Sequence, residues 1–154
     1  MELSDILSAD AVVSKLNATS KKRLLQEIAR VADEVYGLPC TEIFAALQDR
    51  ELLGATGVGN GVAIPHARLA CLDDVKGVFV RLEHPVDYES VDSQPVNLIF
   101  ALLAPEGAGA MHLKSLARVS RTLRDATVCA KLRSSKDANA LFAILTAIQP
   151  SKAA

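Results

Sequence analysis

The length, composition and charge of the chain exclude several classes of protein. Half of its 154 residues are hydrophobic, which is enough for one globular domain with a buried core. Its 17 Lys and Arg residues are balanced by 18 Asp and Glu residues, so no excess positive charge is available to hold a nucleic-acid backbone. We therefore expect a single domain over residues 1–154, with a core from about 3 to 148, and no nucleic-acid partner.

The cysteines and the apolar segments indicate where the protein works. The three cysteines are odd in number and far apart, which fits neither a disulfide framework nor paired zinc ligands. The N-terminus lacks a basic segment followed by an apolar run, and no apolar stretch approaches the ~18 residues needed to span a bilayer. These features predict a cytoplasmic protein without membrane insertion.

The first third of the chain reads as one strand followed by two helices. Residues 11–13 are typical of a short strand, and Ser20 belongs to a polar segment suited to capping a helix that begins near Lys21. Apolar positions then recur with helical period until Gly37, which ends the helix. Thr41 is expected to cap a second helix that reaches about Arg50.

The middle of the chain predicts a glycine-rich loop and then a sheet. Four glycines between positions 54 and 61 disfavour both helix and strand and indicate a shaped loop. Strands are expected at 62–65, 78–82 and 96–103, the last being an apolar run typical of a strand covered on both faces. The prolines and acidic residues within 83–88 and 92–95 favour turns.

The last third is helical. One helix should begin near Met111 or His112, a shorter one should span 127–132, and a third should run over 136–148 with Ser135 as its cap. The element order is thus strand, two helices, three strands and three helices, without a repeat or a linker. This order predicts an α/β fold in which helical layers enclose a sheet.

His66 is the strongest candidate for a reactive residue, because it follows a short apolar strand and a proline. Strand ends and loops bring reactive groups to solvent, and Pro65 should hold the imidazole at a defined exit from the sheet. The glycines ahead of it should let the loop approach the same place. A neutral imidazole attacks phosphorus readily at pH 7 without a separate base. A structural histidine is the competing interpretation, and the surrounding loop favours the reactive one.

Three further side chains are candidate partners for a phosphate on His66. His112 opens a predicted helix, where free N–H groups and the helix dipole favour an anion, although a surface histidine at that position is equally ordinary. Arg50 precedes the glycine-rich loop and has a guanidinium suited to phosphate oxygens, unless it only forms a surface pair with Asp49 or Glu51. Arg68 would share a face with His66 if extended structure continued.

Other chemistries lack their characteristic residues. The loop at 57–61 has no Walker lysine and no following helix, so ATP binding is not expected. The sequence has no Gly-x-Ser-x-Gly elbow and no close pair of His or Cys metal ligands. His84, in the segment Glu83-His84-Pro85, has no glycine-rich or helix-start neighbour and is interpreted as exposed and incidental.

The segment from Gly57 to Ala67, which ends in Gly-Val-Ala-Ile-Pro-His-Ala, resembles the IIA components of the phosphoenolpyruvate-dependent phosphotransferase system of fructose/mannitol type. The resemblance extends from about residue 3 to residue 148 and is greatest to the nitrogen-regulatory IIA proteins. It implies a three-layer α/β/α sandwich with a small mixed sheet. His66 matches the family's phosphorylated histidine, and Arg50 and His112 match its second and third site residues. Asn97 and Met111 depart from the acidic and polar residues expected there.

The resemblance also implies partners. The phosphate donor would be an HPr-like histidine phosphocarrier, and the regulated targets would include potassium-transport regulators and sensor kinases. No cofactor or metal is required, because the phosphate is carried covalently. Two alternatives stay open: a sugar-specific IIA that passes phosphate to a IIB domain, and a binding module that is never phosphorylated. Residues near the site are expected to form the phosphate loop and docking surface; these are Gly59, Asn60, Gly61, Ile64 and Pro65, with Val58, Val62, Ala108, Ala110 and Met111 at the rim. For Val62 and Ile64 the core is the competing and favoured location.

Overall fold

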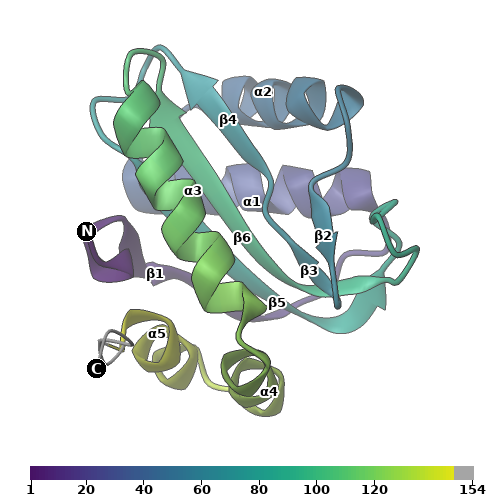
Figure 1. Ribbon diagram of the computed structural model, residues 1–154. Coiled ribbons are helices and arrows are strands. Elements are labelled where there is room, and N and C mark those ends of the chain that lie inside the picture. The colour runs from purple at the N-terminus through teal and green to yellow at the C-terminus, as the bar shows by residue number, and fades with distance from the viewer. Residues whose placement is uncertain (148–154) are drawn as a thin grey trace.

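A computed structural model describes residues 1–147 of the chain, and in this part a mixed sheet lies between helices (Figure 1). The chain enters through a short 3-10 turn, η1, and the helices and strands follow in an order close to the predicted one. Their bounds are η1 Leu3–Asp5, β1 Leu7–Leu16, α1 Lys21–Tyr36, α2 Cys40–Leu52, β2 Gly57–Gly59, β3 Val62–Ala63, β4 His66–Leu69, β5 Lys76–Val86, β6 Val96–Pro105, α3 Gly109–Arg124, α4 Ala126–Ser134 and α5 Ala138–Thr146.

The sheet has the strand order β1-β5-β6-β3-β2, and β4 pairs with β6 beyond the end of β3. β1 runs parallel to β5, β5 is antiparallel to β6, and both β3 and β4 are parallel to β6. β6 is the central strand, and eight of its ten residues are buried. This burial confirms the prediction that the apolar run at 96–103 is covered on both faces.

Helices cover the two faces of this sheet, which confirms the α/β/α architecture (Figure 1). α1 lies behind the sheet, and α3 crosses diagonally in front of it, with α4 and α5 below α3. α2 packs against α1 and against the short strand β4. No helix among residues 1–147 has both the length and the hydropathy needed to cross a membrane.

Several expected boundaries of the helices are confirmed and others are wrong. Ser20 caps α1 by accepting a hydrogen bond from the Arg23 N–H at 3.1 Å, and Gly37 ends that helix with a φ of 68°. Thr41, however, lies inside α2, whose N-cap is Pro39. Ser135 ends α4, whereas Asp137 caps α5 through the Asn139 N–H; residue 148, the expected end of that helix, lies outside the described residues.

The strands are longer than their sequence patterns indicated. β1 extends on both sides of residues 11–13, because parallel pairing with β5 orders polar positions that carry no apolar signal. β5 continues through the segment 83–86 that was expected to turn, and Val86 still pairs with Val96. Pro85 is accommodated because the register shifts between Arg81 and Val86, where a regular ladder would need its missing N–H.

The glycine-rich segment contains a strand and forms a hairpin, whereas a shaped loop without strand structure was expected. β2 pairs antiparallel with β3, and Asn60 and Gly61 connect them with φ values of 56° and 77°. Positive φ at both central positions is the geometry of a tight two-residue turn, which Asn-Gly favours. The expected strand at 62–65 is correspondingly only two residues long and is interrupted before His66.

Candidate functional site

The site is built around a break between β3 and β4. Both strands run parallel to β6, and Ile64 and Pro65 separate them. The Ile64 N–H turns away to donate to the Thr56 carbonyl at 3.0 Å, while the Pro65 carbonyl accepts from the Leu102 N–H at 2.9 Å. His66 is therefore the first residue of strand β4. The sequence pattern predicted a position where the chain leaves the sheet, and the structure corrects that prediction.

The backbone of the break determines the tautomer of His66. Its Nδ1 lies 2.9 Å from the Ile64 carbonyl oxygen. A carbonyl oxygen can only accept a hydrogen bond, so Nδ1 carries the proton and Nε2 keeps its lone pair. The Nε–H of Arg50 donates to this Nε2 at 3.3 Å. The half-buried ring thus presents an unprotonated nitrogen towards a cation.

Arg50 reaches His66 from the last turn of α2. Its Nη1 also donates to the Gly54 carbonyl at 3.0 Å, so the guanidinium is held between the turn after α2 and the imidazole. The alternative interpretation of Arg50, a surface pair with Glu51, is wrong. Glu51 is buried, and its carboxylate binds the Lys21 ammonium at 3.0 Å and the N–H and hydroxyl of Thr56. The neighbouring carboxylate therefore anchors the segment that carries Arg50.

His112 comes from the first turns of α3 and is buried, not a surface residue. Its ring lies edge-on to that of His66, with centroids 5.6 Å apart and an interplanar angle of 67°. Burial first, and then the nearby His66 and Arg68, lower the pKa of His112 from 6.5, so its ring is neutral at pH 7. Its Nε2 is buried and finds no hydrogen-bond partner among the described residues.

These side chains meet at a hollow of about 600 Å³ that suits an anion. Two guanidiniums and two imidazoles face one carboxylate, that of Asp49. The N-cap of α3, Ala108, provides no side-chain cap, so the positive end of the helix dipole near His112 is not neutralised locally. Among residues 1–147, no group of three or more His, Cys, Asp or Glu side chains is placed to hold a metal ion. The hollow is lined by Ala46, Asp49, Arg50, Leu53, His66, Ala67, Arg68 and His112.

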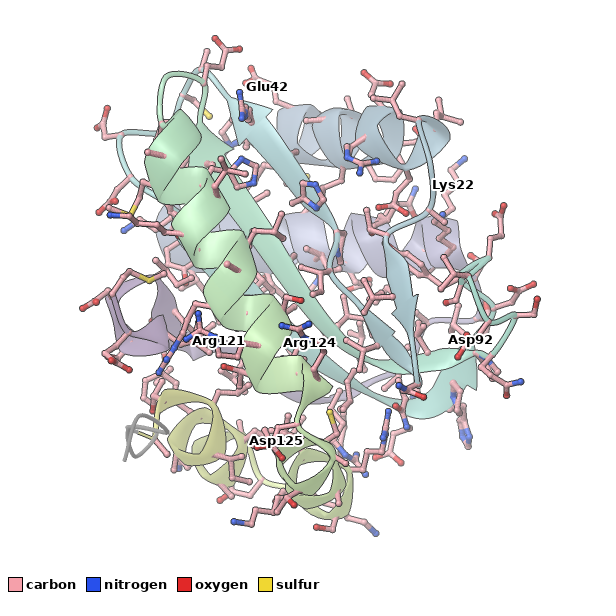
Figure 2. All side chains as sticks on the ribbon, in the orientation of Figure 1. Lys22, Glu42, Asp92, Arg121, Arg124 and Asp125 are labelled. Carbon is pink, nitrogen blue, oxygen red and sulfur yellow. The ribbon has the colours of Figure 1, made fainter. Side chains whose placement is uncertain are left out.

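The residues expected to form a phosphate loop are placed elsewhere. Gly59, Asn60 and Gly61 do not line the hollow, because the tight turn points the hairpin towards α4 and the loop after β5. The Asn60 N–H donates to Asp92 at 2.9 Å, and the Asn60 carbonyl accepts from Arg133. Figure 2 shows Asp92 on that loop beside the hairpin.

The expected docking residues divide into buried and exposed groups. Ile64 and Pro65 are buried and form the strand break, and Val62 is buried in the core. Val58 and Met111 are exposed, with 51% and 42% of their surface accessible. Ala108 is partly buried and Ala110 is exposed. Only the exposed residues of this set are accessible to a docking protein.

Two side chains acquire their importance from the fold. Arg68, whose role depended on continued extended structure, lies on β4 and donates from Nε to Nδ1 of His112 at 3.3 Å. Alternation along a strand was the available signal. Glu51 carried no signal, because its partners Lys21 and Thr56 come from other segments. His84 is exposed, as predicted, and lies on β5 outside the hollow around His66.

Comparison with known proteins places the chain in a family. Residues 5–148 match the family described as the phosphoenolpyruvate-dependent sugar phosphotransferase system, EIIA 2. The chain belongs to this family. It is 49% identical to a nitrogen regulatory protein of Bradyrhizobium diazoefficiens (strain JCM 10833 / BCRC 13528 / IAM 13628 / NBRC 14792 / USDA 110), and the match covers the whole of both chains.

Solved structures agree with this assignment. The nitrogen regulatory protein IIA-Ntr of Neisseria meningitidis superposes with a TM-score of 0.88 at 36% identity, covering 94% of this chain and 99% of that one. The IIA mannitol structure of Escherichia coli gives a TM-score of 0.75 at 19% identity, covering 90% and 97%, and so shares the fold. The chain is thus an EIIA component of the phosphotransferase system that is similar to nitrogen regulatory proteins.

Proposed function

We propose that the chain accepts a phosphoryl group on Nε2 of His66 from an HPr-like histidine phosphocarrier and holds it there covalently, without a cofactor. The observation that carries the proposal is the unprotonated Nε2 of His66, which lies against Arg50 in a hollow shared with His112. A phosphohistidine is a reactive adduct, which suits transfer onward, and membership of the EIIA family favours this chemistry.

In the proposed transfer step, one P–N bond forms and one breaks, and neither a metal nor an added base is needed. The lone pair of His66 Nε2 forms the new P–N bond in line with the bond that breaks, and the electron pair of the broken P–N bond returns to the ring nitrogen of the donor. The proton on Nδ1 stays in its hydrogen bond to the Ile64 carbonyl. Only a phosphoryl group moves.

The side chains around His66 would stabilise the charge on the transferred group. The Arg50 guanidinium donates a hydrogen bond to Nε2, so it must move from Nε2 to a phosphoryl oxygen as the phosphorus approaches. Its positive charge then stays beside the transferred group. His112 would donate from Nε2. Removal of one such preorganised donor slows enzymatic reactions by about 100- to 1000-fold.

The regulatory part of the proposal follows from the change in charge. A phosphoryl group brings about two negative charges into a hollow that is otherwise lined by two guanidiniums and one carboxylate. A partner protein that reads this surface would therefore distinguish the two states. We assign the chain to a nitrogen-type regulatory system in the cytoplasm, with targets such as potassium-transport regulators or sensor kinases, because the relatives named above are nitrogen regulatory proteins.

The test is phosphorylation by enzyme I, the HPr-like donor and phosphoenolpyruvate. The wild type and the His84→Ala control should both acquire acid-labile phosphate, while His66→Ala should acquire none. His84 is a suitable control because it is an exposed histidine outside the hollow. Acid-labile phosphate on His66→Ala would refute the assignment of the acceptor.

Two other functions have different signatures. A sugar-specific IIA is suggested by the fold shared with IIA mannitol, and it would pass the phosphate rapidly to a IIB domain. Transfer assays with fructose-type and mannitol-type IIB domains separate it from the regulatory function. A binding module that is never phosphorylated would show no phosphate on His66 in cells when the protein is analysed by mass spectrometry at neutral or basic pH.

A further inference from the structure

Arg68 is a charged side chain on the same strand as His66 and in contact with the second histidine of the site, His112. It lies two residues after His66 on β4, so both side chains point to the same face of the strand. Its Nε lies 3.3 Å from Nδ1 of His112, and its side chain lines the hollow. β4 thereby connects the proposed phosphate acceptor to the second histidine on α3.

The contact between Arg68 and His112 has one chemical interpretation. A guanidinium has five N–H donors and no acceptor, so Nδ1 of His112 must accept the hydrogen bond with its lone pair. The neutral ring then carries its proton on Nε2. That Nε2 is buried and unpartnered among the described residues, although buried N–H groups are nearly always hydrogen-bonded.

The two histidines are therefore held in complementary tautomers by different groups. The Ile64 carbonyl keeps the proton of His66 on Nδ1, which leaves Nε2 as an acceptor and a nucleophile. The Arg68 guanidinium keeps the proton of His112 on Nε2, which makes that nitrogen a donor. The rings lie edge to face with centroids 5.6 Å apart, so one ring can bind what the other carries.

We infer that Arg68 is a positioning residue for phosphoryl transfer: its Nε–H fixes His112 in the tautomer that donates from Nε2 to an oxygen of the phosphoryl group on His66. This inference rests on the proposed function. Without Arg68, the His112 proton can move to Nδ1, and Nε2 would then present a lone pair to a negatively charged oxygen. The donor would become a repulsive group while the fold stays the same.

Two substitutions separate tautomer control from simple charge. Arg68→Met removes both the donor and the charge, whereas Arg68→Gln removes the charge but keeps an N–H₂ group that can donate to Nδ1. Arg121→Met is the matched control, because Arg121 is an exposed cation on α3 that lies outside the hollow around His66 (Figure 2). Arg68 is itself exposed, so its replacement should leave thermal unfolding near that of the wild type.

The experiment measures two quantities: the His112 tautomer, by long-range ¹H–¹⁵N NMR, and the rate of charging, which is the rate at which the HPr-like donor phosphorylates His66. Arg68→Met should lose the pure Nε2–H pattern of His112 and charge about 10- to 100-fold more slowly, as substitutions of orienting partners do at other sites. Arg68→Gln should retain most of the pattern and recover most of the rate, and Arg121→Met should match the wild type.

The contrary outcomes are distinguishable. An unchanged His112 tautomer in Arg68→Met, or an unchanged charging rate despite an altered tautomer, would overturn the role of Arg68 and leave the proposed function intact. If Arg68→Met and Arg68→Gln were phosphorylated equally slowly, the effect would depend on the positive charge of Arg68 alone. That result would also overturn its role in fixing the tautomer. If the wild type takes no phosphate from any HPr-like donor, the proposed function fails and the inference fails with it.

Discussion

The two ends of the short strand β3 differ in what they build, although only two residues separate them. At its start, Asn60 and Gly61 make a tight turn that contacts Asp92 and Arg133. At its end, Ile64 and Pro65 interrupt pairing and deliver His66 beside Arg50. The glycines thus serve the backbone geometry of the hairpin, and the placement of His66 beside Arg50 comes from the strand break at Ile64 and Pro65. Proximity to His66 in the sequence does not by itself indicate a place in the site.

The largest expected effect belongs to Arg50, at the reactive end. Arg50→Met should slow the charging of His66 by about 100- to 1000-fold, because it removes the cation beside Nε2. The unfolding midpoint should stay near that of the wild type, since the side chain is only partly buried. Rates of phosphate incorporation and thermal unfolding check this, with Arg124→Met, an exposed position on α3 (Figure 2), as the control. Charging at the wild-type rate would remove Arg50 from the mechanism.

Substitution of Glu51 tests whether the contacts that hold the segment around Arg50 in place affect phosphorylation of His66. Glu51→Gln weakens the buried contacts with Lys21 and Thr56, and it should lower the free energy of unfolding by about 1–3 kcal/mol. Charging of His66 should also slow, because the turn after α2 that holds Arg50 loosens. Glu42→Gln, an exposed change on the same helix (Figure 2), should alter neither quantity. A stable Glu51→Gln protein would show that the cluster is not structural support.

Gly61 tests the hairpin end without touching the hollow. Gly61→Ala forces an L-residue to a φ of 77° and places its Cβ 2.6 Å from the Arg133 guanidinium, so it should destabilise the fold by about 1–2 kcal/mol. The charging rate of the folded protein should be unchanged. Gly107→Ala, which meets open space, is the control for stability in chemical denaturation. Slow phosphorylation of the folded Gly61→Ala protein would contradict the claim that the hairpin turn and the site around His66 act independently.

The smallest expected effect is a pH dependence that comes from His112. Because the folded-state pKa of His112 lies below its ordinary value of 6.5, the unfolded chain binds more protons in this range. The free energy of unfolding should therefore fall as the pH drops below about 6.5 and through the folded-state pKa, and stay level above 6.5. His112→Gln should flatten this slope in denaturation curves measured between about pH 8 and about pH 5.5. An identical slope in both proteins would indicate that His112 is not desolvated.

Strong periodic signals predicted the framework well. The amphipathic pattern of α1, with its Ser20 cap and Gly37 end, was interpreted from neighbouring residues alone and matches the structure. The apolar run of β6 was likewise recognisable. Weak signals failed where pairing decided the outcome: β5 passes through the Pro85 segment because β6 offers partners on the far side.

The candidate site was predictable as a set of residues but not as an arrangement. His66, Arg50 and His112 could be named from the family resemblance, and the structure brings all three to one hollow. The glycine turn was placed there wrongly, since the direction of a hairpin depends on strand partners that a local pattern of glycines does not specify. The burial of Glu51 and the contact of Arg68 with His112 had no local signal strong enough to predict them.

Local residue patterns were enough to indicate an α/β chain with a candidate histidine after a proline, because period, capping and proline geometry act between near neighbours in the chain. Long-range packing decided which cation lies beside that histidine and which group sets the tautomer of His112, whereas the nearby Ile64 carbonyl sets the tautomer of His66. Arg50 and His66 are 16 residues apart and Arg68 and His112 are 44 apart, and they meet because β4 lies between α2 and β6, the strand that leads into α3. The functional groups of each side chain are given by the sequence, whereas the orientation of that side chain towards its partners is decided by the folded sheet.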